Sequence, residues 1–321
     1  MRILIIVTVA ALAPAASGSW VYESQWGSSG TGNGQFNHPY SVGVAPNDNV
    51  YVADTNNHRV QYFTATGSYL GQWGMEGSGN GQFDMPWGTA VAPSTGNVYV
   101  ADFGNCRIQY FTATGSYLGR WGSYGSGDAE LNYPGAVAIA ASSGNVYVAD
   151  TDNQRIQYFT ATGSYLGKWG SGGSGNGEFA YPEGIAIAAG GNVYVADTGG
   201  ARVQYFTPTG SYLGEWGSFG SGNGEFNFPF SVAVAPGGDV YVVDTDNVRI
   251  QYFTATGSYL GQWGSGGSGN GQFSHPEGLS FNVTGSRVYV ADTVNDRIQY
   301  FNRNEAAVAP ASLGRVKALF R

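Results

Sequence analysis

The stretch FNHPYSVGVAPNDNVYVADTNNHRVQYF, residues 36–63, recurs along the chain with few changes and decides its fold. In every copy an aspartate ends the V-Y-V-x-D segment, and an arginine follows five residues later. The pairs are Asp54 with Arg59, Asp102 with Arg107, Asp150 with Arg155, Asp197 with Arg202, Asp244 with Arg249 and Asp292 with Arg297. A fixed period of 47 or 48 residues is typical of a repeat architecture. The sequence therefore predicts six copies of one supersecondary unit.

Each copy is expected to form four short strands, which in the first copy are residues 40–45, 50–53, 59–63 and 69–73. Residues typical of turns separate them, namely PND at 46–48, NN at 56–57 and TGS at 66–68. The strands are rich in β-branched and aromatic residues, and no helical period is present. Small residues fill the first strand and bulky ones fill the last two. This gradient indicates propeller blades, which lie close together at the hub and spread apart at the rim.

The ends of the chain supply the evidence for ring closure. The fourth strand ends in Trp-Gly in the first five copies, but the sixth copy stops after its third strand. The missing strand is present at the N-terminus, where YESQWG at 22–27 matches YLGQWG at 69–74. We therefore predict an all-β, six-bladed β-propeller of four-stranded antiparallel blades, in which the N-terminal strand completes the last blade. Such closure removes exposed strand edges.

The repeat itself resembles a known family. The pattern F-x-x-P-x-(G/S)-x-x-V, followed by G-N-V-Y-V-A-D-T-x-N-x-R-(I/V)-Q-Y-F, is similar to the NHL repeat and extends over residues 20–303. The resemblance implies a propeller but does not select an activity. NHL propellers include protein-binding and RNA-binding modules, sensor domains and a few lyases, and a fold does not determine a function.

Composition and the chain termini limit the classes of partner. The net charge is −8 and the repeats contain no run of Lys or Arg, which argues against a nucleic-acid partner. Met1-Arg2, an apolar run and small residues predict a signal peptide over residues 1–19, and hence a secreted, periplasmic or cell-surface protein. Residues 304–321 are expected to form a linker and a short basic tail. We expect a monomer without a transmembrane segment or a disulfide, since Cys106 is the single cysteine.

The features that all copies share are interpreted as structural. Each Asp–Arg pair brackets the turn between the second and third strands and is expected to hold it together. The third residue of that turn is Asn57, Asn105, Asn153, Asn247 or Asn295, and Gly200 in the fourth copy. Because Asn and Gly tolerate a positive φ, this position is expected to take that backbone conformation.

Variation between the copies indicates where a ligand could bind. Alternate loops of an antiparallel meander emerge on opposite faces, and the turn between the third and fourth strands is nearly constant, TATGS. The other face, here the upper face, carries the linkers between blades and the turns between second and third strands. Its variable residues are the candidate ligand-binding set: His38, Tyr40, Met85, Trp87, Phe103, Tyr133, Tyr181, Glu183, Phe228, Phe230, His275 and Glu277.

Aromatic faces suit sugars, peptides and cations, and carboxylates orient hydroxyls and amines. We therefore expect a non-catalytic binding platform for an extracellular polypeptide or glycan, without catalytic residues, cofactor or metal. One alternative is a zinc-dependent lyase resembling the peptidyl-amidating lyases, which hold zinc with three histidines in the channel. Only His38, His58 and His275 are available for that role. The other alternative is a purely structural propeller at the cell surface.

Overall fold

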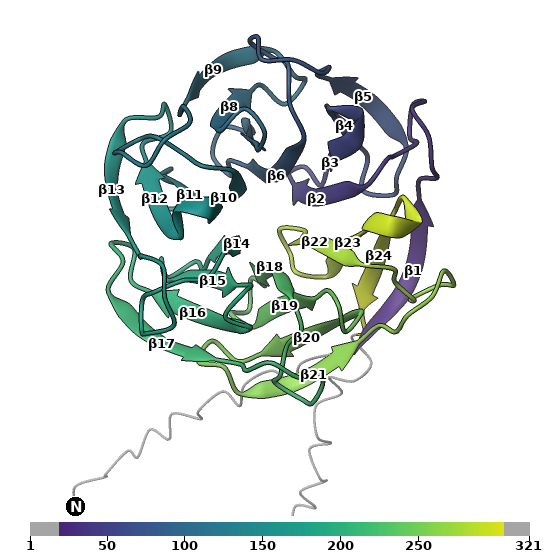
Figure 1. Cartoon of the computed structure of the whole chain (residues 1–321). Helices are drawn as coiled ribbons and strands as arrows, with labels where there is room; N and C mark the ends of the chain where they lie inside the picture. Colours follow the sequence, from purple (N-terminus) through teal and green to yellow (C-terminus); the bar gives the residue numbers. More distant parts are fainter. Residues whose placement is uncertain (1–18, 305–321) are drawn as a thin grey trace, which may run out of the picture.

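The computed structural model describes residues 19–304, which form six four-stranded antiparallel sheets around a central opening (Figure 1). The prediction of an all-β, six-bladed propeller is confirmed. The predicted signal peptide and the predicted tail lie outside the described residues, apart from Ser19 and Asn304. Within residues 19–304 no helix has the length and apolar character needed to cross a membrane.

The strands of each blade follow one another from the hub to the rim (Figure 1). Blade 1 contains β2 (Pro39–Val44), β3 (Val50–Asp54), β4 (Arg59–Phe63) and β5 (Tyr69–Trp73); blade 2 contains β6 (Pro86–Val91), β7 (Val98–Asp102), β8 (Arg107–Phe111) and β9 (Tyr117–Trp121); blade 3 contains β10 (Pro134–Ile139), β11 (Val146–Asp150), β12 (Arg155–Phe159) and β13 (Tyr165–Trp169).

Blade 4 contains β14 (Pro182–Ile187), β15 (Val193–Asp197), β16 (Arg202–Phe206) and β17 (Tyr212–Trp216); blade 5 contains β18 (Pro229–Val234), β19 (Val240–Asp244), β20 (Arg249–Phe253) and β21 (Tyr259–Trp263); blade 6 contains β22 (Pro276–Phe281), β23 (Arg287–Asp292), β24 (Arg297–Arg303) and β1 (Trp20–Trp26). The short 3₁₀ turns η1 (Thr55–Asn57), η2 (Thr151–Asn153) and η3 (Thr293–Asn295) join the second and third strands of blades 1, 3 and 6.

The hydrophobic core is divided into layers between neighbouring blades. In one layer, Tyr99 and Ala101 of β7 pack with Val146 and Val148 of β11, and all four side chains are buried. The second strand is buried along its whole length in blades 1 to 5 because a neighbouring blade covers each of its faces. Fully burying one such aliphatic or aromatic side chain stabilises the fold by about 1.5–3 kcal/mol. Blade-to-blade packing therefore replaces the single central core of other domains.

The repeated Asp–Arg pairs form buried ion pairs at the upper face. Arg59 Nε donates to Asp54 Oδ2 at 2.6 Å, and the same contact recurs at 2.6–2.7 Å in the other five blades. Arg59 also donates to the carbonyl oxygens of Gly32 and Gln35 in the linker that precedes the blade. Asn37 N donates to the second carboxylate oxygen of Asp54 at 2.8 Å. The pair thus fastens each linker onto the turn of its own blade.

The prediction for the third turn residue is wrong. The asparagine is absent from the residues with positive φ, and that conformation belongs to the next residue, where φ is 50–55° at His58, Cys106, Gln154, Ala201, Val248 and Asp296. Asn57 is instead required for its amide. Its Nδ2 lies 3.0 Å from both oxygens of Asp54 and 2.9 Å from the carbonyl oxygen of Gly30. A side-chain donor pattern, rather than a backbone preference, explains this asparagine.

The N-terminal strand closes the ring, as the sequence predicts. β1 pairs antiparallel with β24, from Trp20 opposite Arg303 to Trp26 opposite Ile298 (Figure 1). Trp20 also reaches the preceding blade, where its Nε1 donates to Tyr241 Oη at 3.3 Å. In the other blades the equivalent tyrosine hydroxyl donates to a backbone carbonyl of the next blade's outer turn, as Tyr51 does to Ala113. Because blade 6 has no such turn, Trp20 supplies the missing partner.

Candidate functional site

Eleven of the twelve sequence-predicted ligand residues fall into two sets, divided by the proline that begins each inner strand; Phe103 is the twelfth, and Gly135 completes the second set. The residues before the prolines form an outer ring on the upper face: His38, Met85, Tyr133, Tyr181, Phe228 and His275. The residues after them form an inner ring: Tyr40, Trp87, Gly135, Glu183, Phe230 and Glu277. All six inner-ring residues line the cavity along the axis, and no outer-ring residue does. The inner ring therefore faces the channel, whereas the outer ring does not.

The outer ring is held in an unusual backbone conformation. Its six residues all have positive φ, between 49° and 58°, although none is Gly or Asn. Three of them present exposed aromatic side chains, with Tyr133 39%, Tyr181 53% and Phe228 40% exposed. Left-handed backbone costs a non-glycine residue about 1–2 kcal/mol. The fold thus tolerates strain at the positions where these rings face solvent.

A chain of aromatic contacts links the inner ring to the outer ring. Trp87 stacks on Phe103, with ring centroids 3.7 Å apart, and Phe103 contacts Tyr133 at 4.8 Å. On the other side, Trp87 lies 5.1 Å from Tyr40 and 5.9 Å from Phe230. Since Trp87 belongs to blade 2 and Phe230 to blade 5, these rings meet across the axis. They narrow the upper end of the channel.

Phe103 occupies a position where the other five blades have threonine. In those blades the threonine hydroxyl donates to the carbonyl oxygen of the proline that begins the next inner strand, as Thr55 does to Pro86 at 2.8 Å. Blade 2 replaces this hydrogen bond with the Phe103–Trp87 stack. Blade 2 is thus the one blade of the described propeller that lacks this hydrogen bond.

Of the two inner-ring glutamates, Glu277 is buried and Glu183 is partly buried, and both carboxyls are incompletely hydrogen-bonded. Glu277 is 3% exposed, and its Oε1 lies 3.0 Å from His275 Nδ1. Oε2 of Glu277 and Oε2 of Glu183 are both buried without a hydrogen-bond partner. Burial raises the pKa of Glu183 to about 8 and that of Glu277 to about 7. Each carboxyl is therefore poised to gain or lose a proton near neutral pH.

Tyr40 shares the environment of these acids. Burial, together with the charges of Glu277 and Glu183, raises the pKa of Tyr40 to about 12. His275, on the outer ring, has a raised pKa, chiefly because it hydrogen-bonds Glu277. Its second ring nitrogen lies 3.5 Å from Asp246. An Asp–His–Glu chain thus leads from the exposed surface to the mouth of the channel.

The three histidines of the zinc-lyase alternative do not converge. His58 Nδ1 accepts a hydrogen bond from the backbone N–H of Met85, and His38 Nδ1 lies 3.0 Å from Asn37 Oδ1. The ring nitrogens of His275 lie beside Asp246 and Glu277. Within residues 19–304 no group of three or more His, Cys, Asp or Glu side chains is arranged to hold a metal ion. The residues present therefore do not fit the zinc centre that this alternative needs.

Three exposed apolar side chains on the upper-face linkers were missed by the sequence analysis. Phe219 is 76% exposed, Tyr124 72% and Met75 63%. Tyr124 and Phe219 are equivalent to Ser29, Glu76, Gly172 and Gly266 in the other linkers. The same criterion of variation between copies would have identified them if it had been applied to the linkers.

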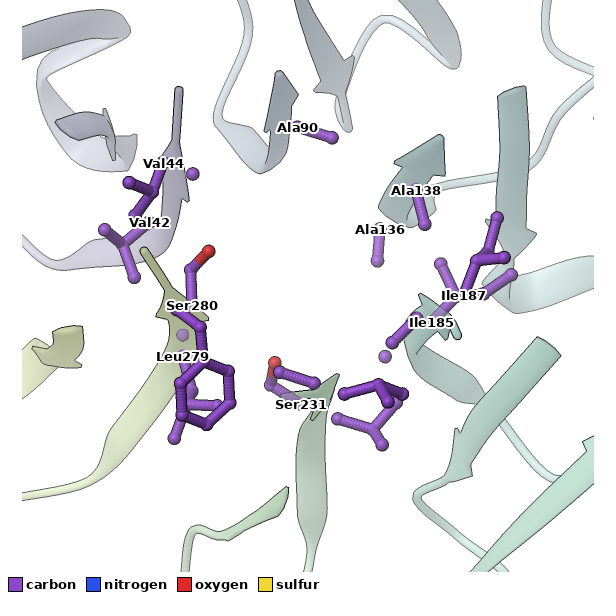
Figure 2. A pocket seen from close by; sticks show the side chains of 18 of the residues that line it. Val42, Val44, Ala90, Ala136, Ala138, Ile185, Ile187, Ser231, Leu279 and Ser280 are labelled. Atoms are coloured by element: carbon purple, nitrogen blue, oxygen red, sulfur yellow. The ribbon is translucent and has the colours of Figure 1, made fainter. Parts of the chain in front are cut away.

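Below the inner ring the channel has an aliphatic wall. The cavity has a volume of about 730 Å³ and is lined by the six inner strands β2, β6, β10, β14, β18 and β22. Figure 2 shows side chains from several of these strands around the open space, among them Val42, Ala136, Ile185 and Leu279. A volume of this size matches that of ordinary small-molecule sites.

Fold and site together define a six-bladed β-propeller with a variable upper face and an axial cavity. A model of the NHL repeat matches residues 36–63, 83–111, 131–159, 179–206 and 226–253, which are the repeat segments of the first five blades. The chain belongs to the NHL-repeat propeller family, as its repeat predicts. No curated protein matches it in sequence.

Several solved propellers share the fold at low sequence identity. A gluconolactonase from Xanthomonas campestris is 15% identical, with a TM-score of 0.62 over 91% of this chain and 99% of that one. A streptogramin B lyase is 15% identical, with a TM-score of 0.60 over 91% and 100% of the two chains. An inactive variant of virginiamycin B lyase from Staphylococcus aureus, solved with quinupristin, is 15% identical, with a TM-score of 0.58 over 86% and 82%.

These comparisons correct the prediction that the protein is not an enzyme. All three similar propellers are named as enzymes, two lyases and one lactonase. The prediction rested on the lack of a recognisable catalytic motif in the sequence. That argument fails because a catalytic group in a propeller need not belong to a linear motif. At 15% identity the likeness itself concerns the fold.

Proposed function

We propose that the protein binds an extracellular polypeptide or glycan on its upper face, through the outer ring and the exposed linker aromatics. The observation that carries this proposal is the exposure of Tyr133, Tyr181 and Phe228 on strained backbone. The scaffold does not require aromatic rings at these positions, because His38, Met85 and His275 occupy them in other blades. Rigidly held aromatic rings supply contact area at a low cost in conformational entropy.

The test is capture of ligands from glycan and peptide arrays by the purified propeller. The triple variant Tyr133→Ala, Tyr181→Ala and Phe228→Ala is expected to lose the ligands that the wild-type protein captures. A matched control is the triple variant Leu70→Ala, Leu118→Ala and Leu166→Ala, since these outer-strand side chains are 44%, 43% and 44% exposed. The proposal would be contradicted if the aromatic variant still bound these ligands or if the leucine variant lost them.

The contacts of Glu277 favour a second candidate function, proton-transfer catalysis at the mouth of the channel. A carboxyl with a pKa of about 7 that is hydrogen-bonded to a histidine suits a general acid or base at neutral pH. The test is turnover of gluconolactone and of a streptogramin B, the substrates named for the similar propellers. Glu277→Gln is expected to lower kcat by about 10²–10⁴-fold. Absence of turnover by the wild-type protein would remove this candidate for both substrate classes.

A further inference from the structure

We propose that the axial channel binds an organic cation with an apolar body, its head between Glu183 and Glu277 and its body along the aliphatic wall. This site is separate from the outer ring and does not depend on the ligand proposed for that surface. The inference comes from the charge of the channel, the rings at its upper end and the composition of its wall.

The ionisable groups of the channel are almost all acidic. Among its lining residues, Glu183 and Glu277 are the only ones with a carboxyl group, Tyr40 is the only other that ionises, and Lys, Arg and His do not occur. Asp152 adds a further negative charge near Glu183. His275 lies 3.0 Å from Oε1 of Glu277, but Oε2 of Glu277 and Oε2 of Glu183 are buried without a partner, which is costly. A cationic head group in the channel would supply a partner for these oxygens.

Aromatic rings surround the same level of the channel. Tyr40, Trp87 and Phe230 contact one another there, with centroid distances of 5.1–6.1 Å. The face of an aromatic ring attracts an ammonium group, and most strongly where water is excluded. The acids and the aromatic rings at this level of the channel therefore both favour a cationic head group.

The aliphatic wall below the inner ring indicates which kind of ligand body the channel can bind. The inner strands present Val44, Ala90, Ala138, Ile187 and Leu279 toward the open space, with Ser231 and Ser280 as scattered hydroxyls (Figure 2). The side chains of this wall are mostly aliphatic, and the wall gains free energy when an apolar body displaces water. The two glutamates, when ionised, repel a carboxylate ligand and attract a cation. An apolar primary amine or quaternary ammonium fits both features.

The experiment is calorimetric titration of the full-length protein with three probes. n-Octylammonium is expected to bind. Ethylammonium has the same head without the body, and n-octanoate has the same body with the opposite charge, so both are expected to bind at least tenfold more weakly. Comparable binding of n-octanoate or of ethylammonium would overturn the proposal.

Two channel variants and two controls locate the site. The isosteric double variant Glu183→Gln, Glu277→Gln and the filling variant Ala136→Phe are each expected to weaken n-octylammonium binding at least tenfold. The control Glu23→Gln removes an exposed carboxyl from the outer strand β1 and is expected to bind as the wild type does. The triple aromatic variant of the outer ring is also expected to bind normally, which separates this site from the proposed polypeptide or glycan surface. Unchanged binding by a folded glutamine variant would overturn the proposal.

Discussion

At the scale of single residues, the functions proposed for this propeller rest on side chains that differ between otherwise equivalent positions. Glu183 and Glu277 stand where other blades have Tyr40, Trp87, Gly135 and Phe230. The blade does not need an acid there, and burial penalises its charged form. Residues that cost stability without serving the scaffold are the ones we connect with ligand binding.

The two acids predict a characteristic pH dependence of stability. Burial raises the pKa of Glu183 to about 8 and that of Glu277 to about 7, above the 4.5 of an exposed glutamate. Between pH 4.5 and 8 the folded protein therefore holds protons that the unfolded chain releases, and the free energy of unfolding falls as the pH rises through this window. At pH 8, Glu183→Gln is expected to be more stable than the wild type by roughly 1–3 kcal/mol.

Urea unfolding at pH 5 and pH 8 measures this effect as the difference between variant and wild type. The difference should be small at pH 5 and should grow toward pH 8. The exposed Glu23→Gln is the control and should show no such trend. A difference that is equal at both pH values would show that the carboxyl of Glu183 is not protonated in the folded protein.

The buried Asp–Arg pairs lead to a second prediction at the residue scale. Asp54→Asn leaves Arg59 without its carboxylate in a site where the aspartate is fully buried. Breaking a buried ion pair from one side costs about 3–5 kcal/mol. Asp128→Asn breaks the exposed contact with Lys168 and should leave the unfolding midpoint unchanged. Equal urea midpoints for the two variants would contradict a structural role of the buried pair.

At the scale of the elements, the constant lower turns pack against the blade that precedes them. Gly67, in the turn between β4 and β5, has a φ of +89°, and an added Cβ would lie 2.6 Å from Trp26 of blade 6. The glycine is therefore required for both its backbone conformation and its lack of a side chain. This packing explains why the TATGS turn hardly varies, whereas the upper-face loops do.

Two glycine variants separate these requirements. Gly96→Ala places a Cβ in open space at a φ of +71° and should cost only the strain of a left-handed residue, about 1–2 kcal/mol. Gly67→Ala adds the clash with Trp26 and should cost a further ~1–3 kcal/mol. Thermal and urea unfolding of both variants measure the difference. A Gly67→Ala variant as stable as Gly96→Ala would show that Trp26 moves aside without cost.

At the scale of the whole molecule, stability depends on the joint between the two ends of the chain. β1 pairs with β24, the third strand of blade 6, and its Trp20 hydrogen-bonds Tyr241 in the second strand of blade 5. Trp20 is 9% exposed and contacts Tyr241, Trp263 and Phe281. The indole N–H groups of the other tryptophans in residues 19–304 are buried without a hydrogen-bond partner.

Trp20→Ala is accordingly expected to cost about 3–5 kcal/mol, the usual range for removing a buried tryptophan side chain. Hydrogen exchange should show the largest loss of protection in β24 and β1, since these strands separate first when the ring opens. Val21→Ala, at a position that is 50% exposed, serves as the control. Uniform loss of protection across all six blades would contradict opening at this joint.

The sequence by itself determined the number of blades, their four strands, the closure by residues 20–26 and the identity of the scaffold residues. Each of these follows from local patterns that repeat every 47 or 48 residues. It also found the variable upper-face residues, but it could not sort them. Positions on either side of a proline look alike in sequence, and only the chain direction at that proline sends one side chain outward and the next into the channel.

The tertiary structure alone decided the rest. The contact of Trp87 with Phe230 joins opposite blades, and the burial of Glu183 and Glu277 depends on inner strands far apart in the chain. The same holds for Asn57, because only the fold brings its amide next to Asp54 and to the linker at Gly30. A repeat pattern identifies the residues that every blade needs in order to fold. The properties of the channel arise where six blades meet, and no single repeat contains that information.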